Sequence, residues 1–255
     1  MMTATPVETI PPITRAEVEG LARTEYARVA DQLRSLTADD WSKPTDCPLW
    51  DVRAMAGHST GMLATFTGYR TLMREMTTAT KAAKRAGKPM IDALTAQQVT
   101  DHAGLSTPDL IEKIDLVGPR AARWRATRPR LFRRMSMKEE VGGEQETWRM
   151  GYLFDVILTR DPWMHRMDIC RATGRAPVLT PDHDGRLVAD VVEEWADRHG
   201  RPYQLHLTGE AGGSFARGDG GPELTLDAVD FCRVLSGRPA QLQVTHDLLD
   251  VGVPF

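Results

Sequence analysis

The chain has 255 residues, of which 41% are hydrophobic and 26% are charged. This composition is typical of a globular protein, and the length suits one large domain or two small ones. Lysine and arginine number 32 against 35 aspartate and glutamate residues, which gives a formal net charge of −3. A charge this close to zero argues against a general binder of nucleic acids or other polyanions.

The sequence predicts a cytoplasmic protein that does not enter a membrane. Its most apolar stretch, residues 150–158, contains Asp155 and is far shorter than the roughly 20 residues that a membrane-spanning helix needs. The first residues show neither the basic cluster nor the apolar run of a signal peptide. The three cysteines, Cys47, Cys170 and Cys232, form no C-x-x-C motif, which fits a reducing compartment.

Helical patterns begin near the start of the chain. Thr14 and Glu17 match a capping box, and apolar residues follow them at helical spacing as far as Leu36. Asp51 suits the N-cap of a second helix, whose apolar stripe predicts that it runs to about Gly87.

Two further long helices are predicted in the first 175 residues. Thr107-Pro108 suits the N-cap and first position of a third helix, which Gly118-Pro119 should kink or interrupt. The fourth helical pattern covers about residues 148–173. Four long helices indicate a four-helix bundle over residues 1–175.

The pattern changes in residues 176–255. One helix is predicted first, followed by two alternating, strand-like runs, residues 203–207 and 223–226, with glycine-rich turns between them. Asp227 suits the cap of a last helix that ends at Gly237. We therefore expect a small α+β domain after the bundle, in a chain that is mainly α.

Histidine and aspartate residues mark a candidate metal site. His58 lies beside the apolar stripe of the second helix, and Asp161 and His165 lie four residues apart on the fourth. Two imidazoles and a carboxylate on facing helices of a bundle could hold a divalent metal with a coordination position left open. The spacing also allows His58 to be a hydrogen-bonded core residue and the other two to form a solvent-exposed pair.

Two motifs resemble those of the mycothiol-dependent maleylpyruvate isomerase family. The first, W-x2-P-T-x-C-P-x-W-D-V-R-x4-H, runs from Trp41 to His58, and the second, D-x-W-M-H-R-x-D-I, begins at Asp161. The segment from L-H-L-T-G to Arg238 is similar to the C-terminal domain of that family. The resemblance implies a DinB-like four-helix bundle in which His58, Asp161 and His165 bind a divalent metal, usually zinc.

The second motif departs from the best-known isomerases at one position. Asp161 stands where those enzymes have Glu, and Pro162 after it removes a helical N–H group and can bend the helix. If Asp161 caps a new helical segment, its one-turn relation to His165 is kept. Asp168, three residues after His165, could orient an imidazole, replace Asp161 as a ligand, or pair with a neighbouring arginine.

Arginines supply further candidates. The run lies between Val117 and Lys138 with no acidic residue among its members, which are Arg120, Arg123, Arg125, Arg128, Arg130, Arg133 and Arg134. It could bind a carboxylate-rich ligand or a nucleic-acid backbone, or form a solvent-exposed face paired with the glutamates that follow it. The family resemblance separately implies a catalytic arginine in the C-terminal domain, and we place it at Arg238.

These features predict a metal-dependent enzyme with a low-molecular-weight thiol as co-substrate, which is mycothiol by resemblance. A metal-bound thiolate would add to an electrophilic small molecule. Rotation and elimination of the adduct would give cis–trans isomerisation, as with maleylpyruvate, whereas release of the adduct would make the protein an S-transferase. Two alternatives stay open: a non-enzymatic module that binds a metal or small ligand, and a nucleic-acid binder that uses the arginine run, against which the net charge speaks.

Overall fold

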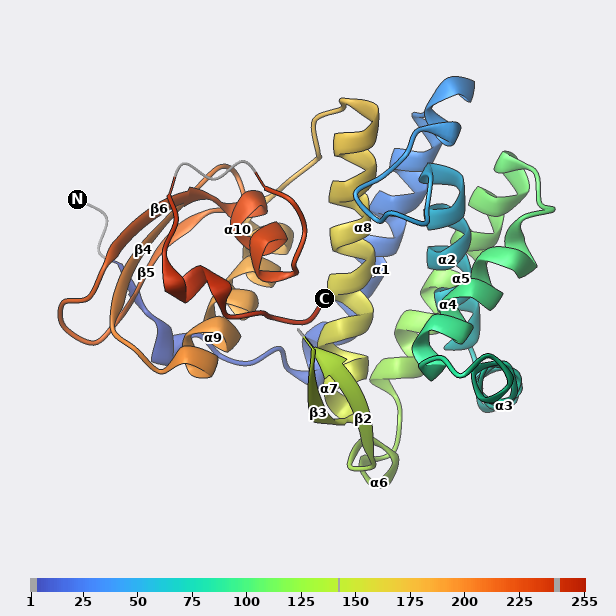
Figure 1. Cartoon of the computed structure of the whole chain (residues 1–255), viewed down its shortest axis with the longest axis horizontal. Coiled ribbons are helices and arrows are strands. Elements are labelled where there is room, and N and C mark those ends of the chain that lie inside the picture. The colour runs from blue at the N-terminus through green and yellow to red at the C-terminus, as the bar shows by residue number, and fades with distance from the viewer. Residues whose placement is uncertain (1–3, 142, 241–243) are drawn as a thin grey trace. The chain divides into compact units, whose positions relative to one another are not determined.

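The computed structural model describes residues 4–141, 143–240 and 244–255 (Figure 1). The chain forms two compact units. The helical unit takes residues 15–133 and 161–177. The mixed unit gathers three separate stretches, from residues 1–14, 134–160 and 178–255. The helical unit thus ends close to the expected boundary at residue 175, while two earlier stretches of the chain group with the C-terminal residues.

The helical unit contains the long predicted helices together with shorter ones. Its elements are α1 (Arg15–Arg34), a 3-10 helix (Ala38–Ser42), α2 (Val52–Thr65), α3 (Tyr69–Ala86), α4 (Met90–His102), α5 (Thr107–Ala126), α6 (Arg130–Arg133) and most of α8 (Leu158–Thr173). Helices α1 and α8 lie side by side (Figure 1), where the Gln32 amide donates a hydrogen bond of 2.9 Å to the Arg166 carbonyl.

The predicted second helix is two helices. Helix α2 ends at Thr65 and α3 begins at Tyr69, with Gly68 between them. The apolar residues from Met62 to Met73 keep helical spacing across this break, so their periodicity conceals it. The Asp51 cap is confirmed, because its carboxylate accepts a hydrogen bond of 2.7 Å from the Ala54 N–H group.

Helix α4 is not predicted from the sequence, and α5 begins one residue earlier than predicted and is not interrupted at Pro119. The buried residues of α4 are Leu94, Gln98 and His102, so its inward face carries almost no hydrophobic pattern. Ser106, one residue earlier than expected, is the N-cap of α5. The helix then continues through Pro119 to its end.

A β-hairpin precedes the last long helix and shortens it. Strands β2 (Ser136–Val141) and β3 (Glu144–Arg149) pair in antiparallel fashion. Trp148, the expected start of the fourth helix, therefore lies in β3, and α7 (Met150–Tyr152) and a π-helical turn (Leu153–Ile157) lead into α8. The hairpin is rich in polar residues on both faces, so it lacks the alternation that predicts a strand.

A four-stranded sheet organises the mixed unit. Its strand order is β1 (Thr5–Pro6), β5 (Gly213–Arg217), β4 (Tyr203–Thr208) and β6 (Glu223–Asp227). The β4–β5 pair is antiparallel, and the β1–β5 and β4–β6 pairs are parallel. The other elements are a π-helical turn (Pro181–Gly185), α9 (Arg186–His199), α10 (Ala228–Leu235) and 3-10 helices at Val7–Thr9 and Asp247–Asp250. The sequence predicts β4, β6, α9 and α10 but neither β1 nor β5.

Aromatic packing joins α9 to the sheet. The Trp195 ring is fully buried and contacts the rings of Tyr203 and Phe231, with centroids 4.7 and 5.2 Å apart. Within the sheet, Leu205 on β4 lies beside Phe215 on β5 and Leu224 on β6 in the register. The expected fold class, mainly α with a helical N-terminal region and a later small mixed sheet, is confirmed.

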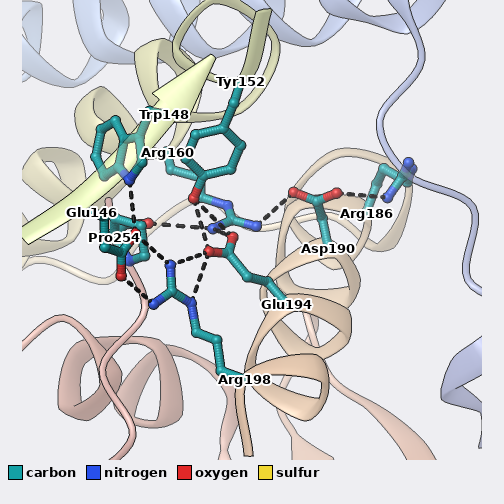
Figure 2. A network of polar contacts seen from close by, with 9 residues as sticks. All are labelled: Glu146, Trp148, Tyr152, Arg160, Arg186, Asp190, Glu194, Arg198 and Pro254. Carbon is teal, nitrogen blue, oxygen red and sulfur yellow. Dashed lines mark hydrogen bonds and ion pairs between the residues drawn. The ribbon is translucent and has the colours of Figure 1, made fainter. Parts of the chain in front are cut away.

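A buried ionic network joins two of the three stretches of chain in this unit, residues 134–160 and 178–255 (Figure 2). The Arg160 guanidinium donates to Asp190 at 2.7 Å, to Glu194 at 2.6 Å and to the Pro254 carbonyl at 3.2 Å. The Tyr152 hydroxyl donates to the same Glu194 carboxylate at 2.8 Å. The network therefore links Tyr152 and the first turn of α8 to helix α9 and the C-terminal segment.

Among the described residues, no helix combines the length and the apolar character needed to cross a membrane.

Candidate metal centre

Helices α2 and α8 position the three candidate ligands. His58 lies in the middle of α2, and Asp161 and His165 lie one turn apart on α8. Pro162 is inside α8, and the helix continues past it. The structure therefore keeps the one-turn relation of Asp161 to His165 that the sequence predicts.

The three side chains converge. The Nε2 atom of His58 lies 3.5 Å from one carboxylate oxygen of Asp161, and the Nε2 atom of His165 lies 3.3 Å from the other. Their potential ligand atoms all lie within 4.8 Å of one another. Both histidines are buried, whereas the Asp161 side chain keeps 22% of its surface exposed. The group is thus enclosed on the histidine side, and its partly exposed member is the Asp161 side chain.

Electrostatic coupling within this group is strong. Burial opposes the ionisation of Asp161, but His165 and His58 outweigh it and hold the pKa of this carboxyl well below its usual range. Burial likewise disfavours a charged His165, yet the Asp161 carboxylate raises the pKa of His165 well above its usual value. The carboxylate thus attracts positive charge to the space between the two imidazoles.

The donor set fits a divalent metal. The Nδ1 atoms of both imidazoles point away from Asp161, that of His58 to Gln98 at 2.9 Å and that of His165 to Asp168 at 3.3 Å. Both Nε2 atoms therefore face carboxylate oxygens, and the buried Oδ2 atom of Asp161 has no hydrogen-bond partner. A divalent metal can replace the proton that His165 holds toward Asp161, and two imidazole nitrogens with one carboxylate oxygen are a common zinc ligand set.

Asp168 contacts His165 and lies close to a cysteine. It is fully buried, and its Oδ2 atom lies 4.0 Å from the Cys47 sulfur. Cys47, His165 and Asp168 form a second group whose ligand atoms lie within 4.8 Å of one another. Both groups contain His165, so this histidine could serve as a metal ligand in either group.

Trp50 covers the histidines. Its ring stacks on His58 with centroids 4.7 Å apart and an angle of 28°, and it meets the His165 ring edge-on at 5.7 Å. The first sequence motif contains Trp50, but the sequence assigns it no role. Gln98 is missed altogether, because it belongs to the helix that the sequence does not predict.

A groove of about 770 Å³ lies in the same unit. The loop before α2 lines it with Cys47 and Trp50, and α3 and α4 contribute small side chains that include Ala82, Ala93 and Ala96. Two residues of the candidate metal centre's surroundings thus also line a largely apolar surface groove.

The arginine candidates lie elsewhere. Arg238 follows α10 in the mixed unit and lines a pocket of about 540 Å³ with Trp148 and Phe255. Within the arginine run, Arg125 is buried beside the Tyr26 ring, and Arg128 stacks on the rings of Tyr69 and Trp124, 4.9 and 4.2 Å from their centroids. These two arginines therefore pack within the fold rather than forming part of a uniformly solvated face.

The class of the protein follows from this arrangement, which is a helical bundle that gathers two histidines and a carboxylate, with a small mixed sheet later in the chain. The chain belongs to the mycothiol maleylpyruvate isomerase N-terminal domain family, whose model matches residues 22–170. The resemblance indicated by the two sequence motifs is therefore confirmed.

Solved structures share the fold at low sequence identity. A crystal structure of the mycothiol-dependent maleylpyruvate isomerase is 16% identical, with a TM-score of 0.53 over 93% of each chain. A mutant of the mycothiol-dependent maleylpyruvate isomerase is 15% identical, with a TM-score of 0.52 over 92% of this chain and 93% of the other. No curated protein sequence matches the chain.

Proposed function

We propose that this protein is a divalent-metal-dependent enzyme that uses mycothiol as co-substrate and acts on a small electrophilic molecule. His58, Asp161 and His165 are the proposed ligands, and zinc is the proposed metal. The observation that carries the proposal is the convergence of two imidazole Nε2 atoms on the two oxygens of one carboxylate. The solved relatives that share the fold are mycothiol-dependent maleylpyruvate isomerases, which supports the choice of thiol.

Different residues of this chain would bind the metal, shield its imidazole ligands and bind the substrate or thiol. A divalent metal bound here supplies a Lewis acid that lowers the pKa of a thiol, so that thiolate forms near neutral pH. Asp161 and the two imidazoles would hold the metal, and the carboxylate would offset part of its charge. Trp50 shields the imidazoles, because its ring covers His58. Arg238 is the proposed partner of an anionic group on the substrate or thiol.

The favoured reaction is cis–trans isomerisation of a maleylpyruvate-type substrate. In this reaction the thiolate adds to a carbon–carbon double bond, rotation follows about the resulting single bond, and elimination returns the thiol. The reaction needs no net change in the thiol.

A second candidate is transfer of mycothiol to an apolar electrophile, in which the adduct is released. The groove of about 770 Å³ favours this candidate, because its small apolar lining suits a larger and less polar molecule than a dicarboxylate. Product analysis with mycothiol separates the two candidates: a geometric isomer with the thiol recovered indicates isomerisation, and a stable S-conjugate indicates transfer.

Metal analysis tests the ligand assignment. The purified protein should carry about one divalent ion per chain, and His165→Ala should lose most of it, since one of three protein ligands is removed. Cys47→Ser is the matched control, because it alters the alternative group without touching His58 or Asp161. Full occupancy in a His58→Ala, His165→Ala double variant would refute the assignment, and loss in Cys47→Ser would move it to the group that contains this cysteine.

Cobalt substitution tests the thiol. Mycothiol should produce a sulfur-to-metal charge-transfer band in the cobalt protein, and glutathione should bind more weakly. A cobalt spectrum that saturating mycothiol leaves unchanged would contradict the thiol assignment while leaving the metal assignment intact.

A further inference from the structure

A buried amide fixes which nitrogen of His58 carries a proton. The Nδ1 atom of His58 lies 2.9 Å from the Oε1 atom of Gln98 on α4. Gln98 is only 4% exposed, and its amide nitrogen lies 3.4 Å from the Thr65 hydroxyl oxygen. The orientation of this amide therefore decides whether it accepts from His58 or donates to it.

The Thr65 hydroxyl settles that orientation. Its single hydrogen is donated to the Gly61 carbonyl at 2.8 Å, so the hydroxyl oxygen can only accept from Gln98. Gln98 must then turn its NH2 group to Thr65 and its carbonyl oxygen to His58. The Nδ1 atom of His58 must therefore carry a hydrogen and donate it to the Gln98 oxygen. When the imidazole carries only this one proton, the lone pair of its Nε2 atom faces Asp161.

Gly61 makes this contact possible. A Cβ atom at this position would lie 2.6 and 2.7 Å from the Cβ and Cγ atoms of Gln98, far inside normal contact distance. One turn earlier, a Cβ atom on Gly57 would lie 3.6 Å from the nearest atom of His102, which is an ordinary contact. Helix α4 therefore approaches α2 more closely at Gly61, beside Gln98, than at Gly57.

We propose that Gln98 is a positioning residue that holds His58 in the Nδ1–H tautomer, with Gly61 and Thr65 fixing the amide, so that Nε2 is kept for a divalent metal. The metal part of this proposal rests on the function proposed above. Without the Gln98 oxygen, the proton moves to Nε2, where Asp161 accepts it. That tautomer removes the lone pair that a metal would use.

The direct test reads the tautomer in the metal-free protein. Long-range proton–nitrogen NMR spectra at alkaline pH should show His58 as the Nδ1–H form in the natural protein and in Gln98→Glu, which keeps an acceptor oxygen. Gln98→Leu should shift the population toward the Nε2–H form. An Nε2–H form in the natural protein, or an unchanged Nδ1–H form in Gln98→Leu, would overturn the proposal.

A second measurement reads cobalt affinity by visible absorption in competition with a chelator. Gln98→Leu should weaken binding roughly 10- to 100-fold, as expected when a partner of a ligating imidazole is lost. Gln98→Glu should restore it, and Gln97→Leu should not change it, because Gln97 contacts Glu75 instead. Equal affinity in Gln98→Leu and Gln97→Leu would overturn the proposal.

The glycine pair separates positioning from general stability. Gly61→Ala should weaken cobalt binding, while Gly57→Ala should leave it unchanged, although both replace a glycine inside α2. Equal losses in the two variants would count against the proposed role of Gly61. If the natural protein bound no cobalt, the proposed metal-dependent function would fail, and the tautomer measurement would still decide the role of Gln98.

Discussion

Histidine surroundings differ sharply at the residue scale between the candidate metal centre and the mixed unit. His165 faces carboxylates, which raise its pKa, whereas His199 faces arginines. Burial lowers the pKa of His199 to about 4, and Arg217 and Arg201 act in the same direction. Its Nδ1 atom also accepts a hydrogen bond of 3.0 Å from the Arg201 N–H group, which a proton on that nitrogen would break.

His199 should therefore make the fold less stable in acid. The unfolded chain binds a proton on this residue near pH ~6.5, and the folded chain binds it only near pH 4. Because the unfolded state binds more protons in this window, the free energy of unfolding falls as the pH drops from the first value to the second. The slope is at most about 1.4 kcal/mol per pH unit, reduced by the partial exposure of the ring.

Urea unfolding at several pH values checks this prediction. His199→Gln should flatten the pH dependence, and His206→Gln should not, because His206 is exposed on β4. Parallel pH profiles for the natural protein and His199→Gln would contradict the predicted coupling.

At the scale of elements, a buried ion pair joins helices α8 and α1. The Arg166 guanidinium donates to Glu25 at 2.8 Å, and both side chains are buried. Arg166 directly follows the candidate ligand His165, so this ion pair fixes the helix that carries two of the three candidate ligands. Loss of the Glu25 carboxylate removes a charged partner from a buried guanidinium.

Glu25→Gln should destabilise the protein by about 3 kcal/mol, because the buried Arg166 guanidinium loses a charged carboxylate partner. The control is Glu19→Gln on the same helix, which disrupts the solvent-exposed pair with Arg23 and should cost only about 0.3–0.5 kcal/mol. Chemical unfolding measures both values. A similar small loss in the two variants would show that the α1–α8 contact does not depend on this pair.

Sequence patterns predict a helix when its buried side chains are apolar, and they fail when its buried side chains are polar. The stripe of α1, with Val18, Ala22 and Val29 buried, is readable from spacing alone. Helix α4 is not, because Gln98 and His102 occupy its buried face. The sequence therefore identified the three candidate ligands through motifs but missed the amide that contacts His58.

The π-helical turn and the hairpin before α8 show a second limit. The helical pattern from Trp148 onward continues through β3, α7 and the turn, yet the chain forms three kinds of backbone there. Pairing of β3 with β2 decides the outcome, and such pairing is a tertiary interaction that local spacing does not report.

Chain connectivity matters at the scale of the whole molecule, because the mixed unit is built from three separate stretches. Arg160 lies before the residues of the helical unit on α8, but its partners Asp190 and Glu194 lie on α9. A chain cut after residue 177 would keep Arg160 and lose both carboxylates. The residues after 177 therefore supply the carboxylates that pair with the buried Arg160 guanidinium.

Glu194 is the residue on which this network depends most, because it accepts hydrogen bonds from Arg160, Tyr152 and Arg198 (Figure 2). Glu194→Leu should lower the free energy of unfolding by about 3 kcal/mol, since Arg160 stays charged and buried with Asp190 as its remaining carboxylate.

Asp247→Asn supplies the control for Glu194→Leu, because its ion pair with Arg201 is solvent-exposed and should change stability little. Unfolding followed by circular dichroism and by tryptophan fluorescence would detect the loss in both secondary structure and the buried Trp195 environment. A Glu194→Leu protein as stable as Asp247→Asn would mean that residues 134–160 are joined to residues 178–255 by contacts other than the ionic network.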